Sequence, residues 1–158
     1  MAKFLFNPSV MTFTTTVPDM KPCTGIQKIC GFTRGLQFHQ VDYFPYWHIS
    51  NSIVLGCNRA SMQHPVVLWL YAYIDGKHVQ AEFHTKQAVG SKVKCKLIWD
   101  KVAMAYIGGE AVSFDIPNKT LPVGWLLNNY AEIDNTNNKT PFHCPVEDLM
   151  VNGRKIKI

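Results

Sequence analysis

The chain has 158 residues, of which 47% are hydrophobic and 17% are charged, and its formal net charge is +5. This length and this apolar content are typical of one folded domain with a two-layer core, and they exclude a globally disordered chain. Lysine and arginine occur mainly as single residues between apolar ones. The sequence has no basic stripe interleaved with aromatic residues, so we expect no nucleic-acid partner.

Short segments with strand character follow one another along the chain, separated by Pro, Gly, Asn or Asp. In chain order the predicted strands are residues 11–16, 25–31, 36–43, 47–56, 66–74, 78–86, 93–99, 102–107, 111–115, 130–133 and 151–158. Helix is limited to one short turn, at residues 122–127 or 145–150. This pattern predicts an all-β protein, a two-sheet antiparallel β-sandwich of the jelly-roll type.

The most regular segment is residues 92–115. Val93, Cys95 and Leu97 alternate with three lysines, which predicts a strand with one buried and one solvated face. Gly108-Gly109 supplies a tight turn between the next two strands, and Asp75-Gly76 marks another hairpin earlier in the chain. Antiparallel hairpins of this kind belong to a sandwich rather than to an α/β enzyme.

The residues that carry chemistry in enzymes and metal sites do not form a recognisable pattern. The five cysteines have irregular spacing without a CxxC pair, and the histidines have no metal-binding spacing. The sequence also lacks the GxSxG motif, a P-loop and a dinucleotide fingerprint. We therefore expect no enzymatic activity, no metal and no cofactor, with cysteines that are thiols and mostly buried.

The N-terminal apolar run is three residues long and ends at Asn7-Pro8, which is too short for a signal peptide. No segment approaches the roughly 18 consecutive apolar residues of a membrane helix. We expect a cytoplasmic protein without membrane insertion; export without a signal peptide is the alternative.

Several segments, in order, resemble the galectin family. The N-terminal segment resembles the start of a galectin in Asn7-Pro8, in Thr16-Val17-Pro18 and in a strand with Ile26, Ile29 and Gly31. Residues 38–42, 53–59, 73–78 and 100–108 are similar to later strands and hairpins of that family. The likeness covers about residues 7–135 and implies a galectin- or concanavalin-like sandwich, with a laminin-G-type jelly roll as the alternative. We treat residues 1–158 as a single domain, in which the segment from about residue 140 is either a C-terminal extension or a displaced final strand.

The resemblance also implies where a ligand would bind, because galectins hold β-galactosides on one concave sheet with polar side chains and a tryptophan. Here Gly56 replaces the family's histidine, while Asn58 and Arg59 match its asparagine and arginine. The tryptophan position falls on His78, and the asparagine of the next strand falls near Tyr71. With a one-residue gap, Glu82 would replace the lost carboxylate. The candidate ligand-binding residues are therefore Asn58, Arg59, Tyr71, His78 and Glu82.

Two functions remain open at this point. The first is a glycan-binding lectin-like module with an altered, non-standard galactoside site and a glycan or glycoprotein as partner. Trp69, Tyr71 and Tyr73 favour it because they share one face of a strand, although aromatic residues also commonly fill a core. The second is a galectin-related protein that has lost sugar binding and acts in protein association or structure, with a protein partner or as a homodimer. The missing family residues favour this second function, in which Arg59 merely pairs with a carboxylate such as Glu82.

Overall fold

The computed structural model describes residues 3–35, 38–40, 47–116, 119–130 and 144–157. Every regular element in these residues is a β-strand. The strands are β1 (Lys3–Phe6), β2 (Val10–Thr16), β3 (Cys23–Thr33), β4 (Phe38–Gln40), β5 (Trp47–Ile49), β6 (Ser52–Arg59), β7 (Val67–Ile74), β8 (Lys77–Glu82), β9 (Lys92–Trp99), β10 (Val102–Ile107), β11 (Glu110–Asp115), β12 (Val123–Tyr130), β13 (Val146–Val151) and β14 (Arg154–Lys155).

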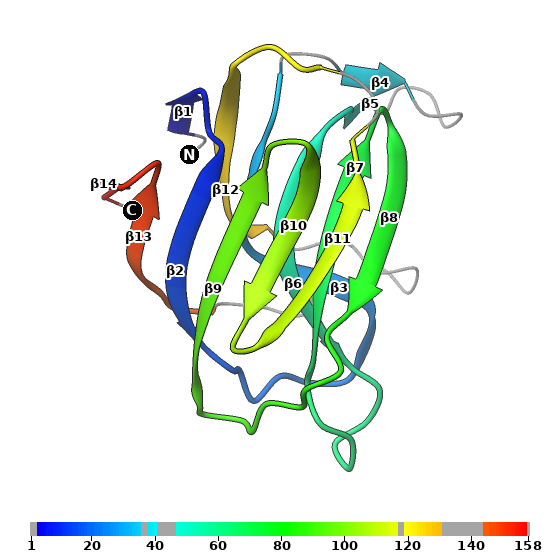
Figure 1. The fold of residues 1–158 in the computed structure, drawn as a ribbon. Helices are drawn as coiled ribbons and strands as arrows, with labels where there is room; N and C mark the ends of the chain where they lie inside the picture. Colours follow the sequence, from blue (N-terminus) through cyan, green and yellow to red (C-terminus); the bar gives the residue numbers. More distant parts are fainter. Residues whose placement is uncertain (1–2, 36–37, 41–46, 117–118, 131–143, 158) are drawn as a thin grey trace.

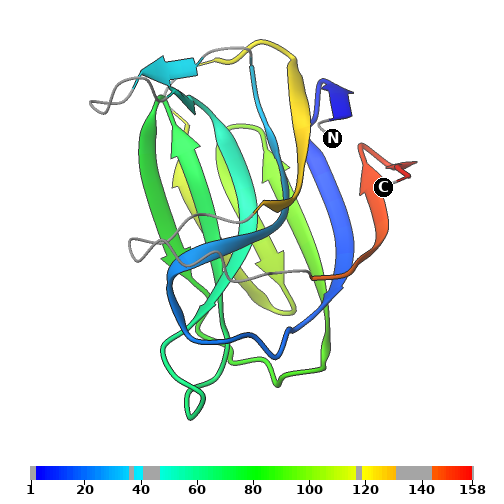
Figure 2. The same cartoon turned by 180° about the vertical axis from the view of Figure 1, so that it is seen from behind.

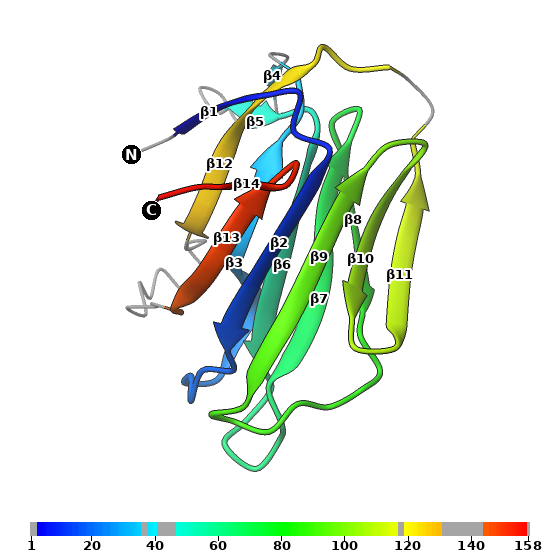
Figure 3. The ribbon, with the colours of Figure 1, turned by 60° about the vertical axis from the view of Figure 1, so that its left-hand side comes forward.

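Two six-stranded antiparallel sheets stack face to face, as Figure 3 shows. Sheet A has the strand order β1-β12-β3-β6-β7-β8, and sheet B has the order β11-β10-β9-β2-β13-β14. Strands β4 and β5 form a small separate pair. The all-β, two-sheet antiparallel sandwich predicted from the sequence is therefore confirmed.

The core lies between the two sheets and follows the period-2 pattern of the sequence. On β9, Val93, Cys95 and Leu97 are buried, while the lysines between them are exposed to solvent. Leu68 and Leu70 of β7 enter the core from sheet A. Alternation of this kind places every second side chain of a strand on the outer face, where a ligand can reach it.

Two predicted hairpin turns have the expected backbone. Asp75 and Gly76 both have positive φ, at 51° and 78°, as the two central residues of a type I′ turn require. They join β7 to β8 and fix a register that runs from Ile74 opposite Lys77 to Trp69 opposite Glu82. Gly108, with φ 58°, turns the chain between β10 and β11.

The two segments offered as helical turns are strands instead. Residues 122–127 lie mostly in β12, which is held between β1 and β3, and residues 145–150 lie mostly in β13, which pairs with β2. Pairing with strands distant in the sequence satisfies the backbone polar groups better than an isolated helical turn would. The predicted strand at 47–56 is divided into β5 and β6, and the one at 130–133 lies almost wholly outside the described residues.

The first and last described strands lie at the same edge of the sandwich (Figure 1). The Lys3 ammonium donates a hydrogen bond to the Lys157 carbonyl at 3.2 Å. Strand β1 ends sheet A and β14 ends sheet B, so each offers one unpaired strand edge. Among the described residues, the chain forms no helix long and apolar enough to cross a bilayer.

Candidate functional site

The outer face of sheet A, the nearer layer in Figure 2, carries a row of aromatic residues on β7. Leu68, Leu70 and Ala72 point into the core, so the alternating residues Trp69, Tyr71 and Tyr73 point away from it. This confirms the predicted division of β7 into an aliphatic and an aromatic face. The aromatic row therefore lies outside the core between the sheets, with Trp69 and Tyr73 partly exposed and Tyr71 buried.

Three rings gather at the β7–β8 hairpin, and we call Tyr71, Tyr73 and His78 the aromatic cluster. The ring centroids are 4.3 Å apart for Tyr71 and His78, 5.7 Å for Tyr73 and His78, and 5.8 Å for the two tyrosines. Tyr71 is buried, Tyr73 is half-buried and His78 is exposed. The Lys28 ammonium lies 4.1 Å from the Tyr71 ring centroid, a cation–π contact that holds this ring in place.

Polar side chains of β8 lie beside the aromatic cluster. Gln80 stands opposite Tyr71 and Glu82 stands opposite Trp69, so all four side chains share the outer face. Gln80 is exposed, and Glu82 accepts a hydrogen bond from the Lys86 ammonium at 2.6 Å. An amide and a carboxylate next to flat rings supply the donors and acceptors that a hydroxylated ligand needs.

Asn58 of β6 is placed on the same face but is already engaged. Its Oδ1 accepts a hydrogen bond from the Trp69 indole N–H at 2.8 Å, and its Nδ2 donates to the Thr24 carbonyl at 3.3 Å. The side chain therefore fixes the orientation of Trp69 beside the cluster. Its carbonyl oxygen keeps a second lone pair that can accept from a ligand.

Arg59 lies apart from the aromatic cluster. Its guanidinium is buried and donates to the Asp19 carboxylate at 2.8 Å and to the carbonyls of Met20, Met62 and His64. The carboxylate that pairs with Arg59 is thus Asp19, while Glu82 pairs with Lys86. Arg59 organises the loop at residues 60–65 at the end of β6.

The surroundings of Gly56 leave no space for the histidine that galectins have at the matching position. Gly56 lies on the outer face between Lys28 of β3 and Trp69 of β7. A Cβ atom at Gly56 would overlap the Cγ2 of Ile26 and would lie 3.0 Å from the Gln27 carbonyl oxygen. The Ile26 side chain therefore occupies the space that a histidine at this position would need.

The structure brings Tyr71 and His78 into contact and places Asn58 and Glu82 on the same outer face, whereas Arg59 points elsewhere. Gln80 was not among the predicted site residues. The sequence nevertheless contained the signal for it, because the two-residue turn at Asp75-Gly76 places residue 80 opposite residue 71.

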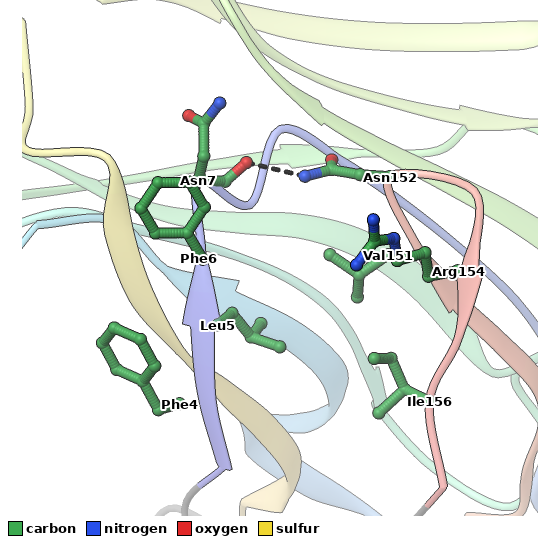
Figure 4. Close-up of a pocket in the computed structure, with 8 residues that line it drawn as sticks. All are labelled: Phe4, Leu5, Phe6, Asn7, Val151, Asn152, Arg154 and Ile156. Atoms are coloured by element: carbon green, nitrogen blue, oxygen red, sulfur yellow. Dashed lines mark hydrogen bonds between the residues drawn. The ribbon is translucent and has the colours of Figure 1, made fainter.

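A second concave surface lies at the edge of the sandwich, between β1 and the β13–β14 hairpin (Figure 4). This edge cleft has a volume of about 440 Å³, and its lining includes Phe4, Leu5, Phe6, Arg154 and Ile156. The Asn152 side-chain amide closes its upper end by donating to the Asn7 carbonyl at 2.8 Å. Phe4 and Phe6 are 51% and 75% exposed, and in Figure 4 their rings lie on the side of β1 away from the β13–β14 hairpin, so β1 presents an apolar face to solvent beside the edge cleft.

Four of the five cysteines are buried thiols. Burial raises the pKa of the Cys30 thiol to about 12 and also raises the pKa of Cys57, Cys95 and Cys144. These four groups are therefore protonated near neutral pH and are poor nucleophiles. Cys57 belongs to the core beneath β6, and the described residues contain no group of His, Cys, Asp or Glu arranged to hold a metal ion.

No family model and no curated protein matches this sequence. Among solved structures, the chain is similar to CG-16, a homodimeric agglutinin from chicken liver, with a TM-score of 0.51, 7% identity and coverage of 96% of this chain and 100% of that one. The LG4-5 domains of the mouse laminin α1 chain give a TM-score of 0.53 at 10% identity, over 97% of this chain and 37% of that one. Scytalido-glutamic peptidase with a transition-state analogue inhibitor gives 0.51 at 12% identity, over 99% and 82%.

At such low identities, the three similarities concern the fold alone. Because an agglutinin, a laminin and a peptidase share this architecture, the function has to be argued from the side chains. The chain has a galectin-like β-sandwich fold, and its outer face on sheet A carries the aromatic cluster.

Proposed function

We propose that the protein is a carbohydrate-binding module whose ligand lies on the outer face of β7 and β8, in a site that differs from the standard galactoside site. The observation that carries the proposal is the aromatic cluster, with three ring centroids between 4.3 and 5.8 Å apart. A sugar ring has one face of C–H groups, and that face packs well on an aromatic surface.

The residues around the cluster supply the polar half of the recognition. Gln80 and Glu82 lie on the same face and provide one amide and one carboxylate for sugar hydroxyls. Each such hydrogen bond contributes about 0.5–1.5 kcal/mol, and about 1.5–3 kcal/mol where a charge takes part. We expect a site with two or three such hydrogen bonds and one half-exposed ring to bind sugars weakly, with a dissociation constant between about 1 mM and 1 μM.

Ordinary lactose is expected to bind weakly to this site or not at all. Histidine is absent at Gly56, where Ile26 fills the space, and an imidazole replaces the family's tryptophan at His78. Arg59 is committed to Asp19 and to three carbonyls. A submillimolar dissociation constant for lactose in calorimetry would contradict this assignment of the site.

A glycan-array screen of the purified protein tests the main proposal, followed by calorimetry with the best sugar. Tyr73→Ala and His78→Ala should weaken binding at least tenfold, which corresponds to about 1.4 kcal/mol. Tyr106→Ala is the matched control, because Tyr106 is a partly exposed tyrosine on β10 of the other sheet. If the two site variants bind as tightly as the control, the sugar does not bind at the aromatic cluster.

The alternative function, protein association, is supported by the edge cleft. Phe6 is 75% exposed on a strand whose outer edge is unpaired, and such edges readily pair with a second chain. CG-16, which has the same fold, is described as homodimeric. The occupant that we propose for the edge cleft is a second copy of this chain.

Sedimentation velocity over a range of protein concentrations tests this alternative. Phe6→Asp should shift a dimeric species to the monomer, because it places a charge on the exposed apolar face of β1. Met62→Asp is the control, since Met62 is similarly exposed at 52% but lies in the loop at residues 60–65. A monomer at all concentrations, or a dimer that survives Phe6→Asp, would remove the edge cleft from the proposal.

A further inference from the structure

A cavity at one end of the sandwich, about 580 Å³ in volume, shares no lining residue with the aromatic cluster and shares Asn7 with the edge cleft. It forms where the end of β3, the β9–β10 turn and the segment before β12 meet. Arg34, Lys101 and Lys119 contribute three positive charges to its lining, and Asp100 contributes one negative charge. Its volume falls within the range of about 300–1,000 Å³ that small-molecule sites occupy.

Arg34 is the fixed element of this cavity. Its Nε donates to the Thr120 hydroxyl at 2.9 Å, and its Nη1 donates to the Pro8 carbonyl at 2.9 Å. Both acceptors are neutral, and no ion pair to Arg34 is formed within the described part of the chain. The guanidinium is thus oriented by neutral neighbours, and Nη2 makes none of the described hydrogen bonds.

The surroundings of Arg34 suit an anion that also carries hydroxyl groups. Burial partly desolvates Arg34 and lowers its pKa from the ordinary value, but a guanidinium stays protonated at neutral pH. Ser9 and Thr120 place hydroxyl groups in the lining, and Trp99, 4% exposed, provides an apolar floor. Partial desolvation strengthens the attraction between a guanidinium and an oxyanion.

We propose that this cavity binds a sulfate or phosphate ester on a small polar molecule, such as an esterified sugar. The Arg34 Nη2, which makes none of the described hydrogen bonds, can donate its N–H groups to an oxyanion, and lysines add charge without strict geometry. Lys101 and Lys119 are exposed, so their contribution is screened by salt and the binding weakens as ionic strength rises. The proposal uses none of the residues of the aromatic cluster, so it stands or falls separately from carbohydrate binding at β7 and β8.

The test follows the Arg34 Nε–H and Trp99 indole N–H resonances of ¹⁵N-labelled protein by NMR. Glucose 6-sulfate, glucose 6-phosphate, inorganic sulfate and glucose are titrated separately at constant ionic strength. We expect saturable shifts at Arg34 with both esters, smaller shifts with inorganic sulfate, and none with glucose. The tighter of the two esters identifies whether sulfate or phosphate is preferred. Glucose shifts equal to those of the esters, or no saturable shift with either ester, would overturn the proposal.

A pair of matched double variants separates a built site from general positive charge. Lys101→Glu with Lys119→Glu should raise the dissociation constant for the better ester at least tenfold, because each replaces an attraction by a repulsion inside the cavity. Lys94→Glu with Lys96→Glu makes the same change in net charge on the exposed face of β9, outside the lining of the cavity. This control should change the dissociation constant less than about twofold. Equal losses in the two double variants would show a non-specific charge effect and overturn the proposal.

Discussion

At the scale of single residues, Arg59 shows that a residue matching a binding motif can have a structural role in this fold. It matches a ligand-binding arginine by position, yet its guanidinium is buried and shared among Asp19 and three backbone carbonyls. Arg59→Ala should lower the free energy of unfolding by about 2–4 kcal/mol, since it removes four hydrogen bonds that are partly or fully buried. Urea denaturation measures this change.

Asp19→Ala is the control for the Arg59 prediction. Asp19 is 68% exposed at its side chain, so its loss should cost less than about 1 kcal/mol, as exposed ion pairs usually do. An Arg59→Ala variant as stable as the wild type would mean that the carbonyl contacts contribute little. In that case Arg59 would again be a candidate for ligand binding.

The contacts made within the β7–β8 hairpin were predictable from the sequence, whereas the contacts made by loop residues were not. Asp75-Gly76 fixes the register of β7 and β8, so the proximity of Tyr71, His78 and Glu82 follows from the sequence. The partners of Arg59 come from residues 19–20 and 62–64, which are not in regular strands and have no periodic pattern to place them. The cavity lined by Arg34, Lys101 and Lys119 was not predicted from the sequence for the same reason, because these residues lie in three separate connections between strands.

At the scale of elements, β12 shows that local sequence propensity can predict the wrong secondary structure. Pro122 followed by apolar residues is a fair helix start, but Gly124 and Leu126 belong to a strand between β1 and β3. Those partners lie more than 90 residues away in the sequence. Local propensity is weak compared with such pairing, so β12 was missed, whereas the period-2 pattern of β9 identified that strand correctly.

Glu110, at the start of β11, joins sheet B to the segment that follows β8 of sheet A. Its carboxylate accepts hydrogen bonds from the backbone N–H groups of His84 at 2.7 Å and Thr85 at 2.9 Å. These bonds favour the charged form and lower the pKa of Glu110 below its ordinary value of 4.5. The contribution to stability is complete above pH 4.5 and is lost as the pH falls through the lower folded pKa.

Thermal melts from pH 7 to pH 3 test the role of Glu110. The wild type should lose stability below pH 4.5 more steeply than Glu110→Gln, because the glutamine cannot take part in this titration. Glu82→Gln is a control on the same side of the molecule, where the carboxylate pairs with Lys86 in solvent. Parallel melting curves for wild type and Glu110→Gln over the acidic range would contradict the prediction.

At the scale of the whole molecule, the five thiols are distributed so that one is accessible and four are enclosed. Cys23 is half-buried, while Cys30, Cys57, Cys95 and Cys144 are buried and have raised pKa values. Iodoacetamide at neutral pH should therefore add one group rapidly, at Cys23, and four more only after unfolding. Mass spectrometry counts the adducts, and melts with and without reductant should coincide. Rapid addition of two or more groups to the folded protein would contradict this arrangement.

The hydrogen bond between Lys3 and the Lys157 carbonyl at 3.2 Å places the first and last described strands close enough to be joined by a short linker. A circularly permuted chain, with the old ends joined by a short glycine linker and new ends between Gly108 and Gly109, should fold to the same two sheets. Both glycines are exposed and have open space around them, so this break removes no core contact. The circular dichroism spectrum of the permuted chain should match that of the parent, and a loss of β signal would show that the chain must begin with β1 in order to fold.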